Sequence, residues 1–183
     1  PRPGERVVHI GAGTGYYTAI LAQVVGGAGT VTAFEIDPTL ASKAADNLRG
    51  YSTVSVVSAS AIDTPLPPSD VVYVSAGVSR LPTGWLDALA VGGRLVVPLT
   101  PTGALGNMWL ITRLDAARYS ARAFSPAAFI PCIGGQDPQR SLALAATLER
   151  GSPVDVRSLR RGGNPDDTAW LVDDGWWLSR AEA

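Results

Sequence analysis

The fold is decided by the stretch Val7-Val8-His9-Ile10-Gly11-Ala12-Gly13-Thr14-Gly15-Tyr16-Tyr17. An apolar run that ends in three alternating glycines predicts a buried strand, a tight turn and a helix start, where the backbone can approach a ligand closely. The next apolar run starts at Val31 and ends in the carboxylate of Glu35, twenty residues after Gly15. An acid at the carboxyl end of the second strand can accept hydrogen bonds from ribose hydroxyls. Together, the two features predict a pocket for an adenosine-containing cofactor.

The spacing of the glycines distinguishes between classes of nucleotide site. Dinucleotide sites have Gly-x-Gly-x-x-Gly, in which the third glycine lets helix and strand pack closely. Here the third glycine comes one residue early and Tyr16 stands in its place, which argues against NAD or FAD. A phosphate-binding loop needs a Gly-Lys pair. The chain contains no such pair, which argues against a nucleoside triphosphate.

The residues from Gly4 to Tyr16 resemble the first motif of class I S-adenosylmethionine-dependent methyltransferases. Within that superfamily the chain is most similar to the protein-L-isoaspartate O-methyltransferases. Two later stretches carry the resemblance in the same order: Asp70 to Pro82 looks like the fourth strand and the loop after it, and Gly92 to Leu99 looks like the fifth strand. The resemblance covers residues 4–137.

The resemblance implies an α/β fold of the Rossmann-like, doubly wound kind, with a seven-stranded, mostly parallel sheet and an antiparallel edge strand. It implies S-adenosylmethionine as the cofactor, S-adenosylhomocysteine as its product, and a protein or peptide substrate that carries an aspartyl or isoaspartyl carboxylate. Such a carboxylate is ionised at neutral pH and needs no general base. The protein then has to align the reacting atoms and exclude water, and no metal site is expected.

The resemblance also assigns roles to residues. Gly11, Gly13 and Gly15 are expected at the methionine portion of the cofactor. Glu35 is expected to hold both ribose hydroxyls, and Ile36 to pack on adenine. The segment 58–62 is expected to border adenine, and Ser75 and Ala76 are expected near the reacting centre. The predicted cofactor-binding residues are His9, Gly11, Ala12, Gly13, Thr14, Gly15, Tyr16, Glu35, Ile36, Ala59, Ser60 and Ser75.

Two positions depart from the family pattern. His9 stands where these enzymes usually have an acid that orients the cofactor's amino group, and a neutral imidazole attracts an ammonium less. Because it lies within a predicted strand, we expect His9 to have a structural or cofactor-orienting role rather than a catalytic one. Ser58-Ala59-Ser60 replaces an acidic segment near adenine, where Asp63 or a serine could substitute. Both departures bear on cofactor affinity.

Apolar runs rich in Val and Ile alternate with amphipathic stretches, as in an α/β fold whose strands are buried on both faces. Asp37-Pro38 is typical of a helix entry, with an acid at the N-cap and proline in the first turn. Strands are predicted at residues 6–10, 30–35, 54–58, 71–75 and 94–99, with a late pair at 108–114 and 119–124. Helices are predicted at residues 17–25, 38–48, 82–90 and 138–148.

The predicted organisation is a methyltransferase core over residues 1–137 and a C-terminal helix and strand extension of the same domain over residues 138–183. Residues 150–167 are rich in Gly, Pro, Arg and Asp and are expected to form a loop. Two short strands, 168–172 and 175–178, are expected around an Asp-Gly turn. The three tryptophans of this extension could form a partner surface, but we expect them to cover the core or the edge of the sheet.

Composition limits the other classes of function. The chain has 183 residues, a formal net charge of −1 and no long basic run, so binding to nucleic acid has little electrostatic support. No apolar stretch has the roughly eighteen residues of a membrane span, so no membrane partner is expected. The single cysteine, Cys132, excludes an intrachain disulfide and fits a reducing, cytoplasmic location. In its apolar surroundings Cys132 is expected to be a buried, unreactive thiol.

Three alternative functions stay open. The first is a tailoring enzyme of the same family that methylates an aspartate of a ribosomally made peptide, which the tryptophan-rich extension would recognise. The second is a methyltransferase for small-molecule hydroxyls or amines, although a hydroxyl acceptor usually needs a base or metal near the pocket. The third is a module that binds the cofactor without turnover, a function with which His9 and Ala59 would be consistent.

Overall fold

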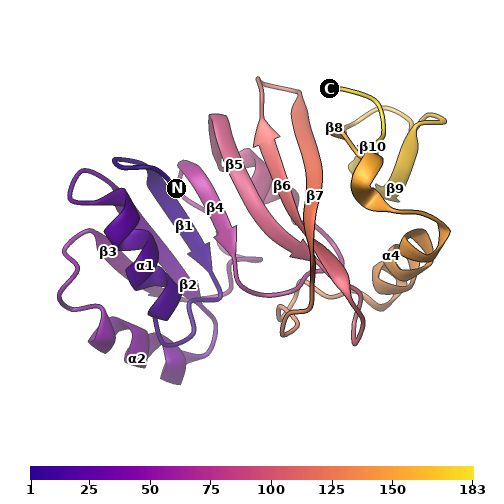
Figure 1. The fold of residues 1–183 in the computed structure, drawn as a ribbon. Helices are drawn as coiled ribbons and strands as arrows, with labels where there is room; N and C mark the ends of the chain where they lie inside the picture. The colour runs from indigo at the N-terminus through magenta and orange to yellow at the C-terminus, as the bar shows by residue number, and fades with distance from the viewer.

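The computed structural model describes all residues from Pro1 to Ala183. Its strands form one ten-stranded sheet in the order β3-β2-β1-β4-β5-β6-β7-β8-β10-β9 (Figure 1). The parallel strands are β1 (Arg6–Ile10), β2 (Thr30–Glu35), β3 (Val54–Ser58), β4 (Ser69–Val74) and β5 (Leu89–Leu99). The strands that pair antiparallel are β6 (Gly106–Arg113), β7 (Tyr119–Ala127), β8 (Ser158–Arg161), β9 (Ala169–Asp173) and β10 (Trp176–Ser179).

Four helices and one 3₁₀ turn accompany the sheet. They are α1 (Tyr16–Val25), α2 (Pro38–Asn47), α3 (Thr83–Asp87), α4 (Pro138–Arg150) and η1 (Pro153–Asp155). The helix entry predicted at Asp37 is confirmed. Its carboxylate accepts hydrogen bonds from the backbone N–H groups of Thr39 and Leu40 at 2.7 and 3.1 Å, and Pro38 lies in the first turn.

Both faces of the parallel strands are covered, which is why these strands read as continuous apolar runs. On one face a small cluster packs under α1; it consists of Val7, Val31, Val71, Leu21, Ala22 and Val25. On the other face lies the main core of 25 buried residues. This main core runs from Val8 in β1 to Leu178 in β10 and includes Trp85 of α3 and Leu144 of α4. The helices therefore lie on both sides of the sheet, as in a doubly wound fold.

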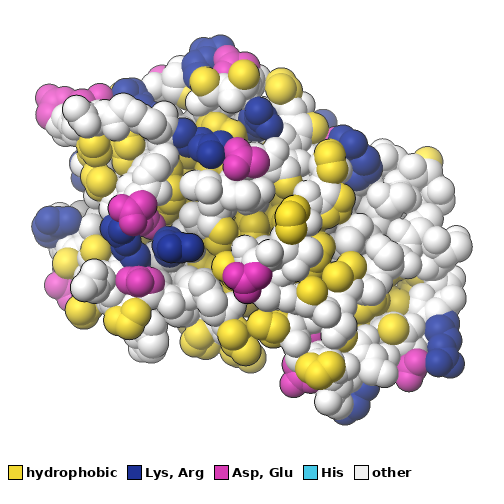
Figure 2. All heavy atoms as spheres, turned by 180° about the vertical axis from the view of Figure 1, so that it is seen from behind, with side chains coloured by type: hydrophobic (Ala, Val, Ile, Leu, Met, Phe, Trp, Pro, Cys, Tyr) yellow, Lys and Arg dark blue, Asp and Glu magenta, His cyan; other side chains and the backbone are white.

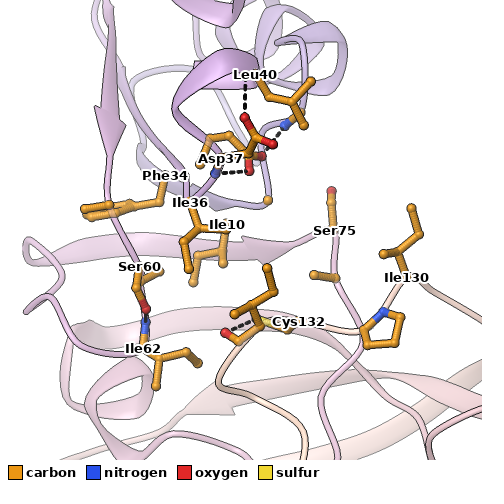
Figure 3. A pocket seen from close by; sticks show the side chains of 18 residues that line it. Ile10, Phe34, Ile36, Asp37, Leu40, Ser60, Ile62, Ser75, Ile130 and Cys132 are labelled. Carbon is orange, nitrogen blue, oxygen red and sulfur yellow. Dashed lines mark hydrogen bonds between the residues drawn. The ribbon is translucent and has the colours of Figure 1, made fainter. Parts of the chain in front are cut away.

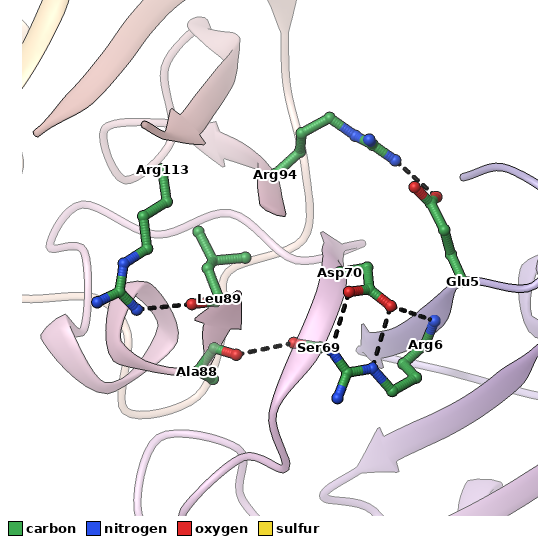
Figure 4. Close-up of polar contacts among 8 residues, drawn as sticks. All are labelled: Glu5, Arg6, Ser69, Asp70, Ala88, Leu89, Arg94 and Arg113. Carbon is green, nitrogen blue, oxygen red and sulfur yellow. Dashed lines mark hydrogen bonds and ion pairs between the residues drawn. The ribbon is translucent and has the colours of Figure 1, made fainter. Parts of the chain in front are cut away.

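Ion pairs hold the amino ends of the parallel strands together (Figure 4). Arg6 of β1 donates from its side chain to both carboxylate oxygens of Asp70 in β4, at 2.9 and 3.1 Å. The hydrogen bond from the Arg6 side chain lowers the pKa of Asp70 below its ordinary value. Arg94 of β5 pairs with Glu5 at 2.6 Å, and Arg113 of β6 donates to the Leu89 carbonyl at 2.6 Å. These contacts tie β1, β4, β5 and β6 at the end of the sheet opposite the glycine loop.

The predicted count of seven strands is wrong, because the C-terminal strands join the same sheet rather than follow it. An antiparallel strand does lie at one edge, but it is β9; the late pair, β6 and β7, lies inside the sheet, and the other edge is β3. Residues 150–167 are not wholly a loop, since they contain η1 and β8. The short, polar sequence of β8 carries little strand signal, and its pairing with β7 and β10 comes from distant parts of the chain.

The predicted third helix is also too long. It was expected at residues 82–90, but α3 ends at Asp87 and β5 already begins at Leu89, five residues before the predicted strand. The strand continues through Gly92, whose φ of 81° accompanies a shift of register: β5 pairs with β4 at Leu89 and again from Arg94. The pair Gly92-Gly93, which in the sequence suggests the start of a strand, is therefore an irregularity inside the longer strand β5.

The tryptophans of the extension are buried, as expected. Trp170 and Trp176 belong to the main core, and the Trp170 ring lies 5.5 Å from the ring of Trp109 in β6. Trp177 points to the other face, where the Arg160 guanidinium lies 4.9 Å from the centre of its ring. These tryptophans do not form an exposed surface for a partner.

No helix of the structure is both long and apolar enough to cross a membrane. On the face seen in Figure 2, basic and acidic side chains are interspersed among hydrophobic ones. This face therefore offers no extended basic track for a nucleic-acid backbone.

Candidate functional site

The glycine loop between β1 and α1 needs its glycines. Gly11, Gly13 and Gly15 have φ angles of 79°, 57° and 93°, a region that other residues rarely adopt. At Gly15 a Cβ would also lie 2.9 Å from the side chain of Leu48, where α2 ends beside the loop. At Gly13 a Cβ would meet no atom within 4 Å, because this residue faces open space. The loop therefore presents bare backbone toward a ligand.

Glu35 connects this loop to the end of β2. Its carboxylate accepts hydrogen bonds from the backbone N–H groups of Gly13 at 2.7 Å and Asp37 at 3.0 Å. The side chain is buried, with Glu35 only 7% exposed. Each carboxylate oxygen keeps a further lone pair for a ligand hydroxyl. The acid thus fixes the loop and lines the pocket at the same time.

A pocket of about 340 Å³ opens at the carboxyl ends of β1, β2 and β4. Figure 3 shows Phe34, Ser60 and Ile62 at one end of it and Ser75 and Ile130 at the other. The walls are mostly apolar, and Glu35 and Asp37 supply the carboxylates. The lining residues are Ile10, Gly11, Gly13, Phe34, Glu35, Ile36, Asp37, Leu40, Ala59, Ser60, Ala61, Ile62, Ser75, Ala76, Ile130, Pro131, Cys132 and Ile133.

One wall of the pocket comes from a distant part of the chain, residues 130–133. This segment is held by the loop after β4: the Gly77 N–H donates to the Ile130 carbonyl at 2.9 Å, and the Cys132 N–H donates to the Gly77 carbonyl at 2.8 Å. Ile130 and Ile133 remain 83% and 68% exposed at the mouth of the pocket. Two apolar side chains at a pocket mouth can cover a ligand and exclude water from it.

The position of Cys132 differs from the buried one that was expected. It is partly exposed and lines the pocket, rather than lying in the core. Burial raises the pKa of its thiol. The group is therefore a neutral thiol at neutral pH, which agrees with the expected lack of reactivity.

His9 does not line the pocket. Its side chain is fully buried between β1 and α1, on the face opposite the main core. Nδ1 lies 2.8 Å from Oγ1 of Thr18 in α1, and Nε2 lies 2.9 Å from Oγ of Ser75. Burial lowers the pKa of His9 to about 4, so the ring is neutral at neutral pH. Of its two hydrogen-bond partners, only Ser75 lines the pocket.

The structure brings most of the predicted site residues together. Those that line the pocket are Gly11, Gly13, Glu35, Ile36, Ala59, Ser60, Ser75 and Ala76. Five do not line it: His9, Ala12, Thr14, Gly15 and Tyr16. Ala12 is a buried residue of the loop, Gly15 is the N-cap of α1, and Tyr16, the first residue of that helix, is 69% exposed. Asp63, considered as a substitute acid, is exposed and also lies outside the pocket.

Several lining residues were missed by the sequence analysis: Ile10, Phe34, Asp37, Leu40 and the segment 130–133. The first two end their strands, as ligand-contacting residues of open α/β sheets do, so their position is a usable signal. Asp37 and Leu40 lie at the start of α2, directly after Glu35. The segment 130–133 carries no such signal, because only its pairing with Gly77 places it at the pocket.

Comparisons of sequence agree with this arrangement. The profile of the family described as protein-L-isoaspartate(D-aspartate) O-methyltransferase matches residues 2–137. The protein-L-isoaspartate O-methyltransferase of Methanopyrus kandleri is 34% identical over 139 residues, which are 73% of this chain and 61% of that protein. The protein-L-isoaspartate O-methyltransferase 2 of Marinobacter nauticus is 37% identical over 134 residues, which are 71% of this chain and 60% of that protein. The chain thus spans about three fifths of the length of these relatives.

Two solved structures share the fold. One is a Plasmodium falciparum protein assigned as a protein-L-isoaspartate O-methyltransferase, in complex with S-adenosyl-L-homocysteine. Its TM-score is 0.64 and its identity 20%, over 72% of this chain and 66% of that chain. The other, a protein-L-isoaspartate O-methyltransferase, has a TM-score of 0.67 and 22% identity over 97% of this chain and 64% of that chain. The second likeness includes most of the C-terminal strands. With a matching family profile over most of its length and relatives above 30% identity, the chain belongs to the protein-L-isoaspartate(D-aspartate) O-methyltransferase family.

Proposed function

We propose that this chain is an S-adenosylmethionine-dependent carboxyl O-methyltransferase that acts on aspartyl or isoaspartyl carboxylates of proteins or peptides. The observation that carries the proposal is the pocket itself. Gly11 and Gly13 of the β1–α1 loop and the carboxylate of Glu35 line it together, in a chain of this family. Membership of the family supports the reaction, and the geometry supports the cofactor.

The residues present fit a nucleoside attached to an amino acid. Ile36, Leu40 and Ile62 offer flat apolar surface for adenine, and Glu35 offers free lone pairs for ribose hydroxyls. The open space beside Gly13 leaves room for the methionine portion. When bound, the cofactor supplies an electrophilic methyl group on sulfur.

The acceptor needs orientation more than activation. An aspartyl or isoaspartyl carboxylate is already ionised at neutral pH, so no residue of the chain has to remove a proton from it. Ser75 and Ala76 at the end of β4 form the floor of the pocket end where we place this carboxylate. Ile130 and Ile133 border the same pocket and reduce access of water, which raises the attraction between unlike charges inside.

The tailoring alternative loses its structural support. It rested on recognition of one dedicated peptide by the tryptophan-rich C-terminal extension, and all three tryptophans there are buried. We therefore favour an enzyme that accepts many isoaspartyl peptides over one with a dedicated peptide partner.

Two measurements on the purified chain test the proposal. Calorimetry with S-adenosylhomocysteine should show binding at a single site. Transfer of a labelled methyl group from S-adenosylmethionine to isoaspartyl peptides of several sequences should give base-labile esters, while the matching peptides with normal aspartate should accept far less. Absence of binding would reject the cofactor assignment. Binding without transfer to either peptide set would reject the acceptor and favour a module without turnover.

A further inference from the structure

Three buried or half-buried groups form a line from α1 to the pocket. Thr18 Oγ1 lies 2.8 Å from His9 Nδ1, and His9 Nε2 lies 2.9 Å from Ser75 Oγ. Thr18 and His9 are both fully buried. Ser75 lies at the end of the line and lines the pocket, directly beside the glycine loop: a Cβ on Gly11 would lie 3.5 Å from the Ser75 carbonyl carbon. The line therefore connects a closed interior with a ligand site.

The direction of these hydrogen bonds follows from the inventory of donors. A hydroxyl has one hydrogen to donate, and a neutral imidazole has one N–H and one acceptor nitrogen. The only hydrogen-bond partner of the Thr18 hydroxyl is His9 Nδ1. If Nδ1 carried the ring hydrogen, the Thr18 hydrogen would be buried without an acceptor, which costs free energy. Thr18 therefore donates to Nδ1, and the ring hydrogen is on Nε2.

The position of the ring hydrogen determines which hydrogen bonds the Ser75 hydroxyl can make. Burial keeps His9 neutral, with a pKa of about 4, so the ring carries only the one N–H. That N–H points at Ser75 and donates to its hydroxyl oxygen. The hydrogen of Ser75 is then free for a ligand, and a hydroxyl that already accepts one hydrogen bond is a better donor than an isolated one.

We propose that Ser75 donates a hydrogen bond to a carboxylate of the ligand in this pocket, and that Thr18 and His9 hold it in the donating orientation. This inference rests on the proposed function, under which the pocket receives two carboxylates. One belongs to the methionine portion of the cofactor, and the other is the acceptor's own. Both have the chemistry that a hydroxyl donor recognises best, because hydrogen bonds to charged groups are the strong ones.

The first experiment tests the direction of the hydrogen bonds and needs no ligand. His9 is the single histidine of the chain, so nitrogen NMR of the labelled protein reports one ring without mutation. At neutral pH we expect a protonated Nε2 and an unprotonated Nδ1. A protonated Nδ1, or an imidazolium with both nitrogens protonated, would overturn the proposal.

The second experiment tests the partner of Ser75 with three ligands. S-adenosylhomocysteine has the carboxylate and the amine, its decarboxylated analogue keeps only the amine, and methylthioadenosine has neither. Ser75→Ala should weaken binding of S-adenosylhomocysteine by about tenfold or more and leave the other two unchanged. Ser60→Ala is the matched control, because Ser60 lies at the other end of the pocket. Any loss that it causes should be equal for all three ligands.

The results for Ser75→Ala show which of the two carboxylates Ser75 binds. If Ser75→Ala leaves all three affinities unchanged but raises KM for the isoaspartyl peptide about tenfold with little change in kcat, the acceptor's carboxylate is the partner and the proposal stands. An equal loss for the decarboxylated analogue would show that the amine is the partner, and an equal loss for all three would show a structural role. Either of these results, or no effect on affinity and KM alike, would overturn the proposal. A failure of the proposed function is recognised separately, because the wild-type chain would then bind none of the three ligands.

Discussion

The carboxylate of Glu35 has two roles. It accepts hydrogen bonds from the backbone N–H groups of Gly13 and Asp37, and it faces the pocket. Replacement by alanine removes the acceptor for the loop and for the ribose together. We expect Glu35→Ala to weaken binding of S-adenosylhomocysteine by more than about tenfold, measured by calorimetry. Glu35→Gln keeps one acceptor oxygen and should lie between the wild type and the alanine variant.

A carboxylate outside the pocket provides the control for this prediction. Asp46, in the last turn of α2, pairs with Arg49 just after the helix; both side chains are exposed, and neither residue lines the pocket. Asp46→Ala should therefore leave the affinity unchanged. If Glu35→Ala matches this control, the ribose assignment is wrong.

His9 makes the stability of the fold depend on pH in a specific window. Its pKa falls from 6.5 to about 4 on burial. The unfolded chain takes up this proton below about pH 6.5, whereas the folded chain does so only near pH 4, so the folded state loses stability as the pH falls through this range. At about 1.4 kcal/mol per pH unit, the loss over this pKa difference amounts to at most about 3.5 kcal/mol.

Urea unfolding of the wild type and of His9→Asn isolates this effect. Asparagine does not titrate, so the free energy of unfolding of the variant should fall less between about pH 6.5 and about pH 5. Acidic groups contribute equally to both curves. Parallel curves for the two proteins would show that His9 does not govern stability in this range.

At the scale of elements, the loop after β4 is packed against the end of β5 with no spare room. A Cβ on Gly77 would lie 2.2 Å from Oγ1 of Thr100, a buried residue. We expect Gly77→Ala to lower the free energy of unfolding by about 1–3 kcal/mol, as overpacking usually does. Because the clash is with one atom, Gly77→Ala in combination with Thr100→Ala should recover much of the loss.

The double variant makes this prediction decisive. Urea unfolding should show a cost for the pair that is smaller than the sum of the two single costs, which is the signature of direct contact. Additive costs would show that Gly77 is needed for another reason, such as its pairing with the segment 130–133.

The same elements show what the sequence can and cannot predict. The strands β1 and β2 begin and end as predicted, because strands that are buried on both faces have continuous apolar runs. The edge strand β3 has no buried residue, and its three valines predict it through their strand propensity. In β8 the sequence is polar and short, so the strand exists only through its partners β7 and β10.

The candidate site shows the same contrast. The glycine loop and Glu35 follow from local spacing, whereas the wall at residues 130–133 depends on pairing with Gly77, more than fifty residues away. The orientation of His9 toward Thr18 follows from strand alternation, which the family pattern alone does not predict.

At the scale of the whole molecule, the C-terminal strands are part of the core that supports the pocket. Trp176 is 2% exposed and belongs to the same buried cluster as Ile10 and Phe34 of the pocket. We expect Trp176→Ala to lower the free energy of unfolding by about 3–5 kcal/mol. In calorimetry the whole chain should still unfold in one transition, at a lower temperature.

Trp177 is the comparison for this prediction. It lies outside the main cluster, and its indole nitrogen is a buried polar atom without a hydrogen-bond partner. Replacement by phenylalanine removes this unpaired donor, so Trp177→Phe should lower the free energy of unfolding less than Trp176→Phe does.

The calorimetry of Trp176→Ala also has an outcome that would contradict a single core. This outcome is an early, separate transition, with the rest of the chain unfolding at the wild-type temperature.

The extent of the main core has a consequence for how the protein folds during its synthesis. Its buried side chains come from Val8 near the start of the chain and from Leu178 near its end. During translation the early strands leave the ribosome with apolar faces whose partners have not yet been made. The buried cluster is therefore complete only once β10 has been synthesised, and until then part of its apolar surface stays uncovered.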